Sequence, residues 1–243
     1  MVPSPLHSTN VSRNRLTLPL PPPHCPPDLE ERILFEENGL LVVNKPPDLP
    51  STGRSLEDPD CLQFWLMRRH EGMVWAVHQL DADTSGINIF TTEKRLVPLL
   101  QRRMRSPEGR KTYLALVHGS PIWTRRKVEA PIGFIDSRSL GITEQGKHAL
   151  SHFRVLHHTT EHALIEANIL TGRTHQIRIH LASLGHPLVG EEWYRDPPCL
   201  HHPRQALHAW KLDLAAGHGP RSFVAPLAPD LCDLAAKMKL SLP

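Results

Sequence analysis

Pairs of short apolar segments joined by tight turns are the feature that most constrains the fold of this chain. The stretch 33–47, ILFEENGLLVVNKPP, places two apolar runs on either side of Asn38-Gly39, a dipeptide typical of two-residue hairpin turns. The stretch 152–170, HFRVLHHTTEHALIEANIL, has the same form, with a polar turn at Thr159 and Thr160. Strand pairs mixed with helices, without regular β-α-β alternation, predict an α+β fold with a mixed, largely antiparallel sheet and flanking helices.

The remaining elements follow from periodicity and from capping residues. Alternating apolar and polar residues predict further strands at 75–78, 87–91 and 111–118, and helical spacing predicts helices at 62–69, 93–105, 175–184 and 231–238. Asp58-Pro59 suits an N-cap followed by proline at the first helical position. Thr174 suits the N-cap of the third helix. Pro98 is expected to kink the second helix or to delay its start.

The N-terminal segment differs in composition from the rest of the chain. Residues 1–27 contain no acidic side chain and are rich in proline, so they cannot build a core. We therefore expect a flexible tail at 1–27 and one folded domain at 28–243. An acid-poor start that contains arginine also suits an organelle transit peptide, although its prolines oppose the amphipathic helix that such a peptide needs.

Apolar runs and cysteines bound the cellular setting. The longest apolar runs, such as 40–43, are far too short to cross a bilayer, so no membrane contact is expected. The four cysteines are scattered and form no Cys-x-x-Cys pair; they are Cys25, Cys61, Cys199 and Cys232. This usage indicates reduced thiols in a cytoplasmic protein rather than disulfides or a zinc site.

Positive charge is concentrated in one part of the sequence. Residues 94–127 contain ten lysines and arginines and one acid, Glu108, whereas the whole chain carries a formal charge of only +3. Such a block suggests a polyanionic partner. A solvated helix face and loop would give the same composition, and charge alone does not separate the two interpretations.

Several short motifs suggest chemistry that their context does not support. HTTEH at 158–162 matches an inverted zinc-peptidase pattern, but that chemistry needs both histidines on one helix face, and here they flank a predicted turn. Asp81-x-Asp83 resembles the start of a calcium loop without its later ligands. Ser85 lacks the Gly-x-Ser-x-Gly setting of a nucleophile. No glycine-rich phosphate loop is present. We therefore expect neither a metal nor a cofactor.

One carboxylate and one distant polar segment remain as candidates for a site. Asp81 lies on a polar turn before a predicted strand, in HQLDADTSG (78–86). The stretch 171–190, TGRTHQIRIHLASLGHPLVG, supplies five polar side chains within eight residues: Arg173, His175, Gln176, Arg178 and His180. A hydrophobic core does not tolerate that density of polar groups. An arginine from this segment beside Asp81 would hold the carboxylate ionised, as a glycosidic nucleophile requires.

These segments resemble the successive motifs of the RluA-type pseudouridine synthases. The resemblance rests on HQLDADTSG (78–86), KTYLALVHG (111–119), TGRTHQIRIHLASLGHPLVG (171–190) and ALHAWKL (206–212), with VVNKPPDLP (42–50) as a further match. It runs from about residue 33 to about residue 212. Four motifs in the right order are highly specific, although none of them is so alone.

The resemblance implies a fold with a central RNA-binding cleft and an RNA uridine isomerase that needs no cofactor or metal. The family's catalytic residues fall on Asp81, Tyr113, which packs against the target base, and Arg178, which pairs with the aspartate. Together with the basic block, it assigns RNA contacts to Gln79, Lys45, Arg102, Arg103, Arg105, Lys111, Arg173, His175 and Gln176. The expected partner is rRNA or tRNA, and the expected state is a monomer. Many members of the family carry a small N-terminal RNA-binding domain, and this chain is expected to have no separate one.

The chain departs from the family pattern at three positions. Gln79 stands where the family usually has an arginine that helps to flip the base or fill its place. Asp48 replaces a glycine, and Glu191 replaces the aspartate after Gly190. The loss of the arginine leaves open a catalytically silent RNA-binding protein on the same fold, although retention of Asp81, Tyr113 and Arg178 together opposes this alternative.

Overall fold

The computed structural model of the protein describes residues 26–198, 202–215 and 222–243. Most of the tail predicted at 1–27 therefore lies outside the described residues. The helices in the described part are α1 (Leu62–His70), α2 (Leu96–Arg105), α3 (Gln176–Ser183) and α4 (Pro229–Lys237). The strands are β1 (Ile33–Glu37), β2 (Leu40–Lys45), β3 (Trp75–Ala76), β4 (Ser85–Thr91), β5 (Arg110–His118), β6 (Arg125–Glu129), β7 (Ile132–Phe134), β8 (Leu140–Ile142), β9 (Leu150–His158), β10 (His162–Ile169), β11 (Leu207–Asp213) and β12 (Ser222–Val224).

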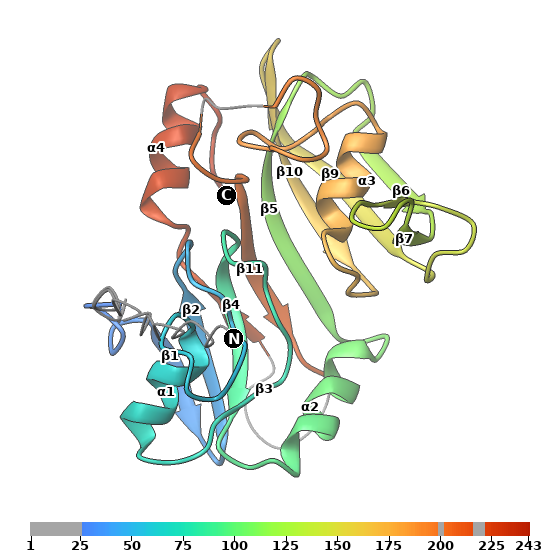
Figure 1. The fold of residues 1–243 in the computed structure, drawn as a ribbon. Coiled ribbons are helices and arrows are strands. Elements are labelled where there is room, and N and C mark those ends of the chain that lie inside the picture. Colours follow the sequence, from blue (N-terminus) through green and yellow to red (C-terminus); the bar gives the residue numbers. More distant parts are fainter. Residues whose placement is uncertain (1–25, 199–201, 216–221) are drawn as a thin grey trace, which may run out of the picture.

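One large mixed sheet forms the centre of the molecule (Figure 1). Its strand order is β1-β2-β4-β11-β5-β10-β9-β6, with β3 paired to β4 and β12 paired to β11. All of these pairs are antiparallel except β4 with β11, which are parallel over two residue pairs. The β7–β8 hairpin forms a separate two-stranded sheet. The predicted α+β architecture with a largely antiparallel sheet is confirmed.

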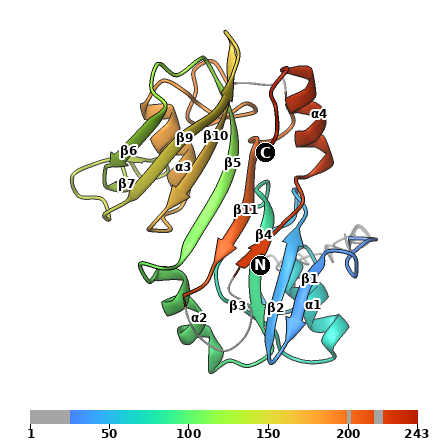
Figure 2. The same ribbon diagram turned by 180° about the vertical axis from the view of Figure 1, so that it is seen from behind.

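The helices cover both faces of the sheet because its strands bury side chains on both sides. On β2, Val42 packs in the apolar cluster that includes α2, whereas its neighbours Leu41 and Val43 pack with α1. In the other half of the sheet, alternate residues of β5 pack against α3 or against α4. Figures 1 and 2 show α1 and α2 beside one half of the sheet and α3 and α4 beside the other.

The two predicted hairpins are present in the structure. Asn38 and Gly39 both have positive φ, 52° and 75°, as a turn matching the strand twist requires, and β1 pairs with β2 across them. Strands β9 and β10 pair across the turn at Thr159 and Thr160. Pro98 is the third residue of α2, so the start of that helix is delayed as expected.

Both predicted N-caps are wrong. Helix α1 begins at Leu62, and its cap is Cys61, whose sulfur accepts the N–H of Phe64. The Asp58 carboxylate instead accepts backbone N–H groups of the preceding loop. Helix α3 begins at Gln176 after His175, which has φ 55° and provides no side-chain cap. Its positive φ keeps His175 out of the helix, so Thr174 lies one residue before the N-cap position.

Two further expectations concern the thiols and the membrane. Cys61 and Cys232 are free cysteines, whereas Cys25 and Cys199 lie outside the described residues. Within the described ranges, no helix combines the length and the apolar character needed to span a bilayer.

Candidate active site

A polar cleft of about 780 Å³ opens between α2 and α3, on the face of the sheet that these helices share. Its floor includes Tyr113 of β5, and the loop that precedes β4 brings Asp81 to its wall. Nine of the twelve predicted site residues line it: Gln79, Asp81, Arg105, Lys111, Tyr113, Arg173, His175, Gln176 and Arg178. The structure therefore brings together segments that are almost a hundred residues apart in the sequence.

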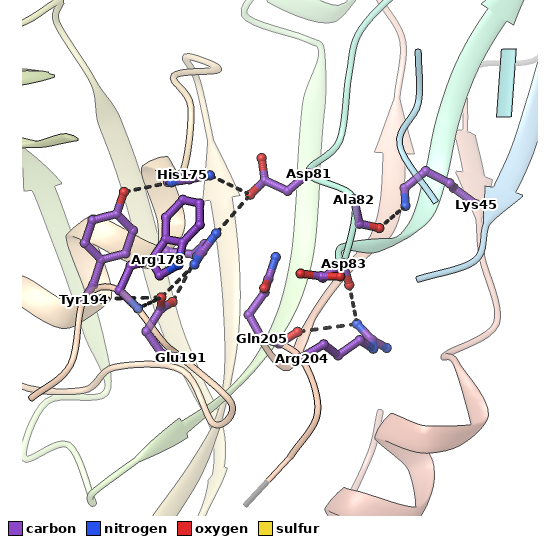
Figure 3. A network of polar contacts seen from close by, with 11 residues as sticks. Lys45, Asp81, Ala82, Asp83, His175, Arg178, Glu191, Tyr194, Arg204 and Gln205 are labelled. Carbon is purple, nitrogen blue, oxygen red and sulfur yellow. Dashed lines mark hydrogen bonds and ion pairs between the residues drawn. The ribbon is translucent and has the colours of Figure 1, made fainter. Parts of the chain in front are cut away.

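The Asp81 carboxylate faces two nitrogen-bearing side chains from α3 and its N-terminus (Figure 3). Its Oδ2 lies 3.8 Å from Nη1 of Arg178 and 3.8 Å from Nε2 of His175. The Asp81 side chain is 28% exposed, so a ligand in the cleft can reach it. Its backbone carbonyl accepts the N–H of Thr84, which closes the turn.

Arg178 makes its closest ion pair with a residue that the sequence did not assign to the site. Its Nε and Nη2 donate to the two carboxylate oxygens of Glu191 at 2.9 and 2.7 Å, and the Glu191 side chain is fully buried. Burial opposes the charge of Arg178, but the hydrogen bonds and charge of Glu191 hold its pKa above the ordinary value. The expected pairing with Asp81 is therefore the longer of two contacts. The sequence drew attention to Glu191 only because it replaces the family's aspartate after Gly190. It did not indicate that Glu191 pairs with Arg178.

His175 is held by an aromatic residue that sequence reasoning also missed. Its Nδ1 lies 2.7 Å from the Tyr194 hydroxyl, on the side of the ring opposite Asp81 (Figure 3). Burial lowers the pKa of His175, although Asp81 acts in the opposite direction. The imidazole is therefore neutral at physiological pH. The permanent positive charge beside the Asp81 carboxylate comes from Arg178.

Two buried cations fix the loop that carries Asp81 from behind. Lys45 is fully buried and donates to the carbonyl oxygens of Pro46, Leu49 and Ala82 at 2.6–2.7 Å. Arg204 donates to the Asp83 carbonyl at 2.7 Å. The two side chains thus bind the backbone carbonyls of the two residues that follow Asp81 (Figure 3). The assignment of Lys45 as an RNA contact is wrong, because its ammonium is enclosed and its three N–H groups already have acceptors.

Close packing of backbone against backbone seats the strand that follows the loop. Gly86 has φ +107°, and a Cβ there would lie 2.3 Å from the carbonyl oxygen of Ala209 on β11. Only glycine permits that approach. Next to it, the buried Ser85 hydroxyl lies 2.9 Å from Nδ1 of His208 and accepts a hydrogen bond from Arg204. Asp48, at a position where the family pattern has glycine, has φ 55°, a conformation that aspartate tolerates better than most residues.

Tyr113 lies in the cleft with its side chain almost enclosed, at 7% exposure. Burial, together with the charge of Asp81, raises the pKa of its phenol well above the usual range. The phenol therefore keeps its proton at neutral pH. A protonated phenol suits a ring that packs against a nucleobase. It does not suit a general base, which must accept a proton.

Basic side chains line the part of the cleft near α2, but the predicted cations differ in exposure. Lys111 donates to the Thr171 carbonyl, and burial, with Arg105 and Arg173 nearby, lowers its pKa to about 8. Arg105 is exposed at the cleft, and Arg173 donates through Nε to the His148 carbonyl. Arg102 is exposed but does not line the cleft.

Two predicted RNA contacts have structural positions instead. Arg103 is buried and donates through Nε to the Ala215 carbonyl, because it lies on the face of α2 turned toward the sheet. Gln176 is 2% exposed; its side chain bonds Thr171 and the Arg173 N–H, and its amide nitrogen reaches Ser151. It fixes the start of α3 rather than a ligand.

The HTTEH segment lies at the β9–β10 turn, with His158 ending one strand and His162 beginning the next. The one-face helical arrangement that a zinc peptidase needs is therefore not formed there. In the described part of the chain, no cluster of three or more potential metal ligands is present.

The mixed sheet carries a polar cleft with basic walls, in which a reachable carboxylate lies beside a buried guanidinium. This arrangement is typical of an enzyme that acts on an anionic ligand. Residues 39–183 match the family model described as RNA pseudouridylate synthase. The chain belongs to this family, as its motifs indicated.

Individual relatives agree with this assignment. The chain is 34% identical over 221 residues to the ribosomal large subunit pseudouridine synthase D of Nitrosomonas europaea, covering 84% of this chain and 64% of the relative. It is 34% identical over 189 residues to the uncharacterized RNA pseudouridine synthase YhcT of Bacillus subtilis, covering 74% and 62%. The chain thus spans somewhat less than two thirds of the length of these relatives.

Solved structures share the fold. The human RNA pseudouridylate synthase domain containing 4 superposes with a TM-score of 0.73 at 23% identity, covering 88% of this chain and 95% of that one. The human RNA pseudouridylate synthase domain containing 1 gives a TM-score of 0.65 at 27% identity, covering 86% and 94%.

Proposed function

We propose that the protein isomerises specific uridines in structured RNA to pseudouridine, with Asp81 as the catalytic carboxylate. The observation that carries the proposal is the position of Asp81. It is reachable from the cleft and lies 3.8 Å from the charged Arg178, in a chain of the RNA pseudouridylate synthase family. The names of the bacterial relatives point to ribosomal RNA as the first substrate to test.

The reaction exchanges one bond of the base for another without any net oxidation. The bond between C1′ and N1 of the uridine breaks, the base rotates, a bond forms between C1′ and C5, the C5 proton is lost, and N1 takes up a proton. Positive charge develops on the sugar as the first bond breaks, and an adjacent carboxylate stabilises or captures it. A route through a glycal instead uses the carboxylate to remove a sugar proton. Both routes require an ionised Asp81 next to the sugar.

The other residues of the cleft serve binding and orientation in this proposal. The target base must leave its stack, at a cost of a few kcal/mol, and the Tyr113 ring offsets roughly 1–3 kcal/mol of this by stacking. Arg178 supplies a positive charge 3.8 Å from the Asp81 carboxylate. Arg105, Lys111 and Arg173 contact phosphates, since Lys111 with a pKa of about 8 is mostly protonated at neutral pH.

The test compares two isosteric substitutions in one loop. Asp81→Asn should abolish tritium release from RNA labelled at uridine C5 while leaving the fold and RNA affinity intact. Asp83→Asn is the matched control and should retain activity, because its side chain faces a pocket behind the loop rather than the cleft.

The RNA target itself is found by mapping pseudouridines in rRNA and tRNA from a deletion strain. Turnover by Asp81→Asn would refute the assignment of the catalytic group. A wild-type protein that binds RNA but modifies none, with turnover restored by Gln79→Arg, would establish the silent RNA-binding alternative.

A further inference from the structure

An aromatic ring that is both exposed and immobilised lies beside the candidate site. The Trp193 side chain is 67% exposed, among the most exposed large apolar side chains of the described residues. Its backbone N–H donates to the Glu191 carboxylate at 3.1 Å, the same carboxylate that fixes Arg178. The residue is therefore anchored at its main chain by the charged centre of the site, although its ring faces solvent.

The ring is also held from one side by two residues of the cleft. The Arg178 guanidinium carbon lies 5.1 Å from the centre of the indole, within the range of a cation–π contact. The His175 ring lies 5.0 Å away at an interplanar angle of 59°. Both of these residues contact Asp81 at 3.8 Å. The indole is thus separated from the catalytic carboxylate by a single side chain.

We infer that Trp193 is a stacking platform for a nucleobase of the RNA strand that flanks the target uridine, outside the cleft. The inference rests on the proposed function and identifies a second base-binding position for it. Tyr113 is enclosed and can pack only against a base that enters the cleft, whereas Trp193 offers a ring to a base that stays outside. Because the ring is already fixed, stacking on it costs little additional ordering.

The surroundings of Trp193 favour a base over an apolar protein surface. An apolar partner needs a contiguous apolar patch, whereas the indole is bordered by the polar side chains of Arg178 and His175. Basic side chains of the adjacent cleft, Arg173 and Lys111, can hold the phosphates of the same strand. Stacking on an aromatic ring tolerates any base, so the platform contributes affinity and register rather than sequence readout.

The test measures the part of RNA affinity that depends on bases. Dissociation constants are measured for wild type, Trp193→Ala and Trp193→Phe with two probes: a single-stranded oligouridylate, and an abasic ribose-phosphate oligomer of the same length. Trp193→Ala should weaken oligouridylate binding about tenfold and leave abasic binding unchanged, and Trp193→Phe should keep most of the affinity. Val224→Ala, which removes an exposed apolar side chain from β12, is the control and should change neither constant.

The two probes separate stacking from a merely structural effect. Equal weakening on both oligomers would show that the indole only supports Arg178 and His175, and would overturn the inference. Unchanged oligouridylate affinity in Trp193→Ala would overturn it as well, as would a Trp193→Phe variant as weak as Trp193→Ala. Binding is measured without turnover, so the comparison remains decisive even if wild type forms no pseudouridine and the proposed function itself fails.

Discussion

Replacing Arg178 by methionine is the perturbation whose consequence the structure defines most sharply. The substitution keeps much of the side-chain length but removes the guanidinium from Glu191, which is fully buried. Breaking a buried ion pair by deleting one partner costs about 3–5 kcal/mol, because the remaining charge is left unpaired. The N–H of Trp193 still donates to Glu191, so we expect the lower end of that range, about 3 kcal/mol, in the free energy of unfolding.

The assay is urea denaturation of wild type and variant at neutral pH, with Arg154→Met as the matched control. Arg154 forms an ion pair with Glu166 of similar length, 2.6 Å, but its side chain is 48% exposed, so its loss should cost less than about 1 kcal/mol. If Arg178→Met costs no more than Arg154→Met, the buried Arg178–Glu191 pair does not carry the energy assigned to it.

Three further outcomes follow from the site. Burial lowers the pKa of Lys45 to about 7, so above pH 7 the unfolded chain binds more protons than the folded one. The free energy of unfolding of wild type, relative to that of Lys45→Met, should therefore rise by about 1.4 kcal/mol per pH unit between about pH 7 and pH 9. Urea denaturation at several pH values measures this rise. Gln79 is exposed and donates to the Thr52 hydroxyl, so Gln79→Ala should slow single-turnover modification less than Arg178→Ala does, and Gln79→Arg should keep or improve RNA affinity. Arg105→Glu should reduce the slope of log K against log salt by at least about 0.7, whereas Arg103→Met should lower thermal stability and leave that slope unchanged.

The sequence predicted the parts of the fold that depend on local rules. The hairpin at Asn38-Gly39 formed because that dipeptide accepts positive φ at both positions. The N-caps at Asp58 and Thr174 failed because capping depends on the path of the preceding chain. In the structure, Asp58 closes its own loop, and α3 begins at Gln176 after His175, so Thr174 lies one residue too early to be its N-cap.

Motifs placed residues in the cleft more reliably than they assigned their contacts. The positions of Asp81, Tyr113 and Arg178 are close to those expected. Lys45 could not be recognised as a buried clamp from the sequence, since a lysine is rarely enclosed and its three carbonyl acceptors come from two separate segments. Glu191 was likewise not assigned, because only the folded chain turns it back toward α3. Burial and pairing are long-range properties, and a linear motif carries no information about them.

The parallel pairing of β4 with β11 has a consequence for when the site comes into existence during folding. Arg204, just before β11, holds the Asp83 carbonyl from a position 121 residues further along the chain, and the Ser85–His208 contact spans 123 residues. Contacts over such separations carry the full entropic cost of closing a long loop. A nascent or partly unfolded chain therefore has the Asp81 loop without the restraint from Arg204 and without Arg178 beside it. The candidate site thus forms only when the sheet is complete.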